Sequence, residues 1–101
     1  MSVNVTSKNF SKFIFDSSEP VLLHFADQTE ISRRQEMYLK HFSMEWPHVT
    51  IGRVDTVKEP SLAAMYGIEQ APAVKIFKKG RCTASATGLQ DNIHLTRLIA
   101  K

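Results

Sequence analysis

The sequence predicts an α/β fold in which helices cover both faces of a central mixed sheet. Apolar segments typical of strands alternate along the chain with segments whose apolar residues recur at helical spacing. This alternation favours parallel strands joined by right-handed crossovers. Near the C-terminus, two strand-like segments are separated only by Lys79-Gly80, which predicts a hairpin at one edge of the sheet. The predicted order is β-α-β-α-β-α-β-β-α, in three layers (α/β/α), within a single domain that spans residues 1–101.

The individual elements follow from local patterns and from residues that start or stop them. The run Val21–Phe25 is almost continuously apolar, as expected of a strand that is covered on both faces. The predicted strands cover residues 2–5, 21–25, 49–54, 73–78 and 81–87. The predicted helices run from Ser7, which can cap the first, through Ile14, from the segment 27–32 to Pro47, from Pro60 to Gly67, and over residues 89–100, where Gln90 or Asp91 is the cap.

Composition and charge are those of an ordinary globular domain. Hydrophobic residues make up 43% and charged residues 23% of the chain, which argues against a disordered protein. The net charge is +3, and acids and bases are interleaved, so the basic cluster at residues 75–81 is interpreted as a solvated hairpin tip. No apolar segment is long enough to cross a membrane, and the N-terminus lacks the features of a signal peptide. We expect a cytoplasmic protein without nucleic-acid or membrane partners.

The segment from Tyr66 to Gly80 resembles the thioredoxin superfamily. It contains Tyr-Gly-Ile, three further residues, Pro72, an apolar strand and Lys-Lys-Gly. In that superfamily Tyr-Gly-Ile, a cis-proline, an apolar strand and Lys-x-Gly recur together. The resemblance covers nearly the whole chain and implies a thioredoxin-like fold. It also implies that an extended peptide would be held by main-chain bonds beside Pro72.

The cysteine pair that gives thioredoxins their chemistry is missing. In the family, the helix after the second strand begins with Trp-Cys-Gly-Pro-Cys-Lys, where unpaired N–H groups and the helix dipole stabilise a thiolate. With a one-residue deletion, the motif falls on Thr29-Glu30-Ile31-Ser32, whereas an ungapped match places Glu30 and Arg33 there. Neither register contains sulfur. The hydroxyls are interpreted as helix caps, with Asp27 or Thr29 as the N-cap and Glu30 completing a capping box after Asp27.

Three other positions bear on function. His24 stands where thioredoxins have a buried aspartate, and we expect a satisfied, partly buried histidine. Arg33-Arg34 is interpreted as a solvated face, with an anion or an acidic partner as the alternative. Cys82, the only cysteine, is interpreted as a small buried side chain. Its alternative is a reactive thiol, because the cations Lys79 and Arg81 lie close to it in the sequence.

The sequence alone therefore favours a redox-inactive binding module, an adaptor or chaperone-like protein without disulfide reductase activity, cofactor or metal. The expected partner is a protein or an extended peptide. The alternative is an atypical thiol–disulfide oxidoreductase or a monothiol redox protein that acts through Cys82. The predicted partner-binding residues are Thr29, Glu30, Ile31, Ser32, Ala71 and Pro72.

Overall fold

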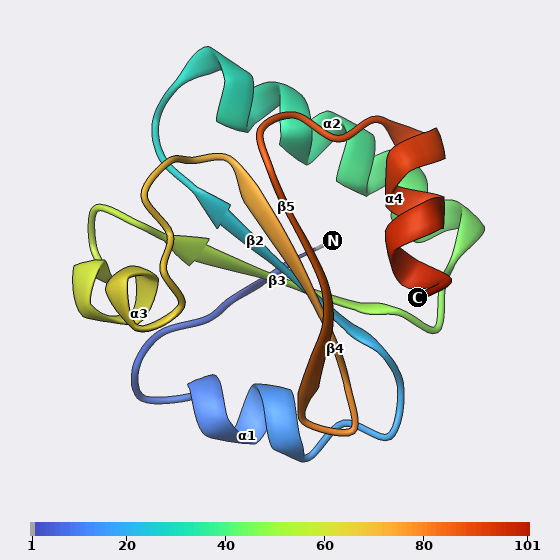
Figure 1. Cartoon of the computed structure of the whole chain (residues 1–101), viewed down its shortest axis with the longest axis horizontal. Coiled ribbons are helices and arrows are strands. Elements are labelled where there is room, and N and C mark those ends of the chain that lie inside the picture. Colours follow the sequence, from blue (N-terminus) through green and yellow to red (C-terminus); the bar gives the residue numbers. More distant parts are fainter. Residues whose placement is uncertain (1) are drawn as a thin grey trace.

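A computed structural model describes residues 2–101 and confirms the predicted three-layer α/β fold (Figure 1). The sheet has five strands in the order β1-β3-β2-β4-β5. The strands are β1 (Val3–Asn4), β2 (Val21–Ala26), β3 (Thr50–Asp55), β4 (Ala73–Lys78) and β5 (Arg81–Thr87). The helices are α1 (Phe10–Phe15), α2 (Glu30–Glu45), α3 (Pro60–Met65) and α4 (Asn92–Ile99). Helices α2 and α4 cover one face, and α1 and α3 cover the other (Figure 1).

The central strand β2 belongs to both hydrophobic cores, because all six of its residues are buried. Val21, Leu23 and Phe25 face the core beneath α1 and α3. Leu22 faces the core beneath α2 and α4. The strand pairs in parallel with β3, as the alternating pattern predicts, and antiparallel with β4. The apolar run in the sequence is therefore explained by burial on both faces.

Several predicted helix ends differ from the observed ones. Ser7 does not cap α1, whose N-cap is Asn9 without a side-chain cap bond. Helix α4 starts at Asn92, three residues later than predicted, and Asp91 is its N-cap, accepting from the His94 N–H at 3.0 Å. Gln90 is not the cap, because its backbone bonds to Gln35 instead. In these three cases the choice among neighbouring polar residues depends on tertiary contacts that local sequence does not encode.

Strand register determines which residues share an end of the sheet. Phe25 pairs with Ala73, so the segment before β4 lies at the end where β2 leads into α2. Val21 pairs with Phe77, and Phe77 pairs with Cys82, so the thiol lies at the opposite end. Lys79 and Gly80 form the tight turn there, both with positive φ (54° and 79°). A side chain at Gly80 would also collide with the Phe15 ring, with contacts of 2.6 Å.

A buried glutamine joins α2 to the segment that precedes α4. The Gln35 side-chain amide donates to the Gln90 carbonyl at 2.9 Å, and its oxygen accepts from the Gln90 N–H at 2.7 Å. Gln35 is fully buried, so these two bonds provide hydrogen-bond partners for an amide that is shielded from solvent. The pair fixes the start of α4 against the middle of α2.

Within residues 2–101, no helix is both long and apolar enough to cross a membrane.

Replacement of Gln35 tests this connection. Gln35→Ala should lower the free energy of unfolding by about 1–3 kcal/mol, because it removes two hydrogen bonds from a buried position. Urea unfolding followed by circular dichroism measures the change. Gln28→Ala, at an exposed residue before α2, is the matched control and should stay within about 0.5 kcal/mol of the parent. Equal stability of the two variants would show that the connection contributes nothing.

Candidate functional site

Thr29 is the N-cap of α2, at the place where the family carries its first cysteine in the gapped alignment. Its backbone is extended (φ −77°, ψ 160°), and its hydroxyl accepts from the Ser32 N–H at 3.3 Å. The capping box predicted from Asp27 to Glu30 does not form. The N-cap is Thr29, so Glu30 is the first helical residue and not the third. Its carboxylate lies 3.7 Å from Arg33 in an exposed ion pair.

Asp27 accepts hydrogen bonds from both hydroxyls at the start of α2. Its Oδ1 accepts from the Thr29 N–H at 3.0 Å, from the Thr29 hydroxyl at 2.6 Å and from the Ser32 hydroxyl at 2.8 Å. These bonds, above all that from the Thr29 hydroxyl, lower the pKa of Asp27 from 3.8. Ser32 is buried, and its oxygen also accepts from the Asp27 N–H at 3.2 Å. Both hydroxyls are thus occupied in holding the helix start, as the capping interpretation requires.

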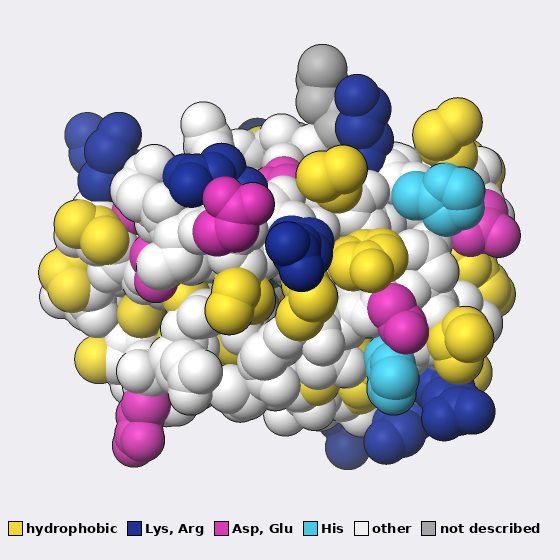
Figure 2. Space-filling view, turned by 90° about the horizontal axis from the view of Figure 1, so that it is seen from above, with side chains coloured by type: hydrophobic (Ala, Val, Ile, Leu, Met, Phe, Trp, Pro, Cys, Tyr) yellow, Lys and Arg dark blue, Asp and Glu magenta, His cyan; other side chains and the backbone are white. Residues whose placement is uncertain are grey.

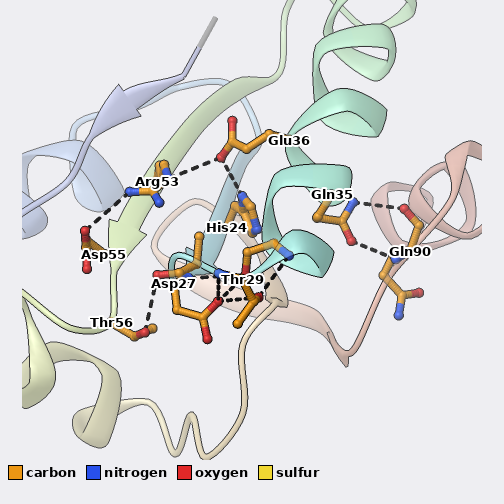
Figure 3. A network of polar contacts seen from close by, with 11 residues as sticks. His24, Asp27, Thr29, Gln35, Glu36, Arg53, Asp55, Thr56 and Gln90 are labelled. Carbon is orange, nitrogen blue, oxygen red and sulfur yellow. Dashed lines mark hydrogen bonds and ion pairs between the residues drawn. The ribbon is translucent and has the colours of Figure 1, made fainter.

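His24 belongs to a network of hydrogen bonds and ion pairs that joins β2, α2 and β3 (Figure 3). Its Nδ1 lies 2.8 Å from a Glu36 carboxylate oxygen. The Arg53 Nε lies 3.4 Å from that same oxygen, and Arg53 also pairs with Asp55 at 3.8 Å. Because a carboxylate only accepts, Nδ1 carries the proton of this bond. The hydrogen bond from His24, with the charge of Arg53, lowers the pKa of Glu36 from 4.5.

The expectation for His24 was wrong in two respects. The side chain is completely buried, not partly, and its Nε2 has no hydrogen-bond partner among residues 2–101. Sequence reasoning also missed Glu36 and Arg53. Glu36 comes twelve residues after His24 and Arg53 a further seventeen, so no local spacing signals their meeting. The parallel pairing of His24 with Arg53 across β2 and β3 brings them together.

Ala71 and Pro72 lie at the same end of the sheet as the start of α2. The peptide bond between them is cis. Pro72 is buried, and its carbonyl accepts from the Gly88 N–H at 2.8 Å. At the start of α2, Ile31 is 52% exposed and Glu30 points to solvent. The structure thus places the six predicted partner-binding residues at one end of the sheet.

Cys82 lies near the other end and is exposed, so the prediction of a buried side chain is wrong. It lies on β5, the edge strand of the sheet, opposite Phe77. The ring of Tyr66 packs edge-on against Phe77, with centroids 5.7 Å apart. Burial raises the pKa of the Tyr66 phenol from 10.0, and the nearby charge of Cys82 adds to this effect. The thiol therefore lies on the α1 and α3 face, beside an aromatic cluster.

Comparison of the sequence with known proteins finds one family. The family model described as Thioredoxin matches residues 1–101. A thioredoxin of Chlamydia pneumoniae is 35% identical over 98 residues, which cover 96% of this chain and 94% of the relative. The chain belongs to the thioredoxin family. A thioredoxin of Chlamydia trachomatis is 33% identical over the same coverage, and thioredoxin 1 of Synechococcus elongatus is 28% identical over 99 residues, 96% of this chain and 92% of the relative.

These relatives overturn the expectation of a redox-inactive adaptor or chaperone-like module. The curated relatives that match nearly the full length are named thioredoxins, which favours a redox role. The prediction of a redox-inactive module assumed that a chain without the cysteine pair of the motif has no thiol chemistry. This thioredoxin-family chain still carries one thiol, and the structure exposes it. Of the two functions weighed from the sequence, the comparisons favour the one that uses Cys82.

The position of the lost thiol pair can be tested by restoring it. In a Cys82→Ser background, Thr29→Cys with Ser32→Cys should form an internal disulfide under mild oxidation. The first position is the N-cap, and the backbone N–H of the second already reaches the side chain of the first at 3.3 Å, so two thiols there can adopt the Cα separation of about 5.5–6 Å that a disulfide prefers. Alkylation of free thiols followed by mass spectrometry measures closure. Glu30→Cys with Arg33→Cys is the control, and preferential closure of that pair would place the family motif in the ungapped register.

The Glu36 network should be visible in the pH dependence of stability. Because the folded pKa of Glu36 lies below 4.5, its ionised form stabilises the fold above that pH. That contribution is lost as the pH falls from 4.5 through the folded pKa. Glu36→Gln should therefore flatten the acid limb of the free energy of unfolding. Urea unfolding across this range measures it, with the exposed Glu69→Gln as control. Parallel acid limbs in the parent and Glu36→Gln would contradict the network.

Proposed function

We propose that this thioredoxin-family chain is a thiol–disulfide redox protein that acts through the single thiol of Cys82. The exposure of Cys82 carries the proposal, because only an exposed thiol can reach a disulfide of another molecule. Family membership supports redox chemistry, and the chain has no other cysteine to perform it. We place this function in the cytoplasm, where thiols are kept reduced.

The chemistry follows from having one thiol instead of two. The Cys82 thiolate attacks one sulfur of a substrate disulfide, the S–S bond of the substrate breaks, and the second substrate sulfur leaves as a thiolate that takes up a proton. Cys82 is then held in a mixed disulfide. A low-molecular-weight thiol from solution attacks the substrate sulfur of that bond and releases Cys82 as thiolate. A second molecule of this thiol completes the reduction and leaves as the oxidised dimer.

The surroundings of Cys82 suit a protein or extended-peptide substrate. Strand β5 is the last of the sheet, so one of its edges is free for a substrate strand to pair with. Lys79 and Arg81 are exposed beside the thiol in the chain and attract anionic substrates. The aromatic cluster of Tyr66 and Phe77 gives the thiol an apolar neighbour on its own face. A disulfide in an acidic, extended segment fits this surface.

The predicted partner-binding residues at the α2 end do not contribute to this exchange step. Pro72 precedes β4, and Phe77, opposite Cys82, is five residues further along the chain, so about 17 Å of extended strand separates the two ends. A substrate bound beside Pro72 would need to span that length to present its disulfide to Cys82. We propose that exchange occurs at the Cys82 end, and that contacts at Thr29–Ser32 and Ala71–Pro72 are a separate feature of the partner surface.

Catalysed removal of glutathione from a peptide tests the function. The parent protein should accelerate reduction of a glutathionylated peptide by reduced glutathione, and a mixed disulfide at Cys82 should be trapped by rapid alkylation. Cys82→Ser should lose both the acceleration and the trapped species. The consumption of NADPH through coupled glutathione reductase measures the rate, and intact mass measures the adduct.

A relocated thiol separates the site from simple thiol reactivity. Cys82→Ser with Ser85→Cys moves the thiol three residues along the same exposed edge strand, to a residue that pairs with Lys75 instead of Phe77. Because Phe77 and Lys75 are two positions apart on β4, both thiols lie on the same face. The relocated thiol should not restore the rate. Equal rates for the parent and the relocated variant would show that the surroundings of Cys82 contribute nothing and would overturn the proposal.

A further inference from the structure

The outward face of α2 carries apolar side chains that the fold does not use. The inward face is formed by Ser32, Gln35, Leu39 and Phe42, all buried. On the opposite side, Met37 is 72% and Met44 76% exposed, although the outside of a surface helix is normally polar. They are seven residues apart, so they lie on one line along the helix, about 10 Å apart. Ile93, at the start of α4, is also 64% exposed.

A groove lies beside Met37, at the N-terminal end of this line. Its volume is about 720 Å³, and its walls come from α2 and from the start of α4. The lining residues are Arg34, Met37, Tyr38, His41 and Asn92. The Gln35–Gln90 connection and the contact of Asn92 with Glu45 at 3.4 Å hold the start of α4 in place against α2. The groove is therefore preformed by the fold.

Cations flank the apolar line. Arg33, Arg34 and Lys40 are exposed on α2. Two exposed acids lie on the same helix: Glu30 pairs with Arg33 at 3.7 Å, and the Glu45 carboxylate lies 3.6 Å from the His41 ring. Within residues 2–101, neither Arg34 nor Lys40 forms an ion pair. Figure 2, which shows the molecule from above, displays hydrophobic side chains interspersed with Lys, Arg and His side chains, and with some Asp and Glu side chains, on this face.

We propose that the outward face of α2, with the groove beside α4, is a docking surface for an acidic amphipathic helix of a partner protein. Apolar side chains of that helix at i, i+3 or i+4 and i+7 match the two-turn spacing of Met37 and Met44. Methionine adapts its shape to such contacts. Acidic residues beside them meet Arg34 and Lys40. Charge disfavours a second copy of this chain as the occupant, since self-association through this face would bring those cations against their own counterparts. This surface is distinct from Cys82 and does not depend on the redox proposal.

Binding of a synthetic helical peptide to the full chain tests the proposal. The peptide carries leucines at i, i+3 and i+7 with glutamates on either side, and its control has the same composition in scrambled order. The helical peptide should bind, and the amide signals that shift in nitrogen-15 NMR spectra should cluster on α2 and the start of α4. Binding should weaken with added salt, because the flanking charges are exposed.

Two variants and a matched control identify the contacts. Met37→Gln with Met44→Gln should weaken binding about tenfold or more, by removing the apolar anchors. Arg34→Gln with Lys40→Gln should also weaken it and should reduce the salt dependence. Met65→Gln replaces a methionine of similar exposure (67%) on α3, across the sheet, and should leave binding unchanged. Folding of each variant is checked by circular dichroism.

Four results would overturn the proposal. The first is an absence of signal shifts with the helical peptide, and the second is equal weakening by Met65→Gln. The third is a dimer of the parent in sedimentation that the Met37 and Met44 variant dissociates, which would make a second copy the occupant. The fourth is binding to anionic lipid vesicles that depends on the same methionines while the peptide does not bind, which would make the surface a membrane contact.

Discussion

Burial of β2 on both faces is the constraint on which the other features of this structure depend. Val21, Leu23 and Phe25 contribute to one core and Leu22 to the other, so the register of the strand against β3 and β4 cannot slip without exposing apolar side chains. That register fixes where α2 begins, which residues of β4 lie near it, and how far Cys82 lies from them. The two cores lie on opposite faces of the sheet, so α2 and α4 pack on one face and α1 and α3 on the other.

His24 is the exception within this strand. A fully buried imidazole needs partners, and the structure supplies one through Glu36 while leaving Nε2 without any among residues 2–101. An unsatisfied buried nitrogen costs about 1–3 kcal/mol. Glu36 is itself held by Arg53, so the histidine is linked to the surface through a carboxylate that contacts both solvent and core. The network thus ties α2 to β2 and β3 at the point where thioredoxins carry an aspartate.

The sequence predicted the fold well because the signals were redundant. Alternating elements, the two-residue turn and the Pro72 strand each indicated the same architecture, and strand ends were correct to within about two residues. The site was predicted less well. Cys82 was predicted to be buried because cysteine usually is. It lies on an edge strand, however, where one side has no neighbouring strand. Glu36 and Arg53 meet His24 only through sheet register and helix rotation, and no short pattern contains that information.

The single exposed cysteine also makes the chain convenient for spectroscopy. A maleimide dye or spin label attached at Cys82 would occupy one defined position, because there is no competing thiol. That position is on the α1 and α3 face, remote from the outward face of α2 and from the Ala71–Pro72 end of the sheet. A label there would therefore report the tumbling and association of the molecule while leaving both of those surfaces uncovered.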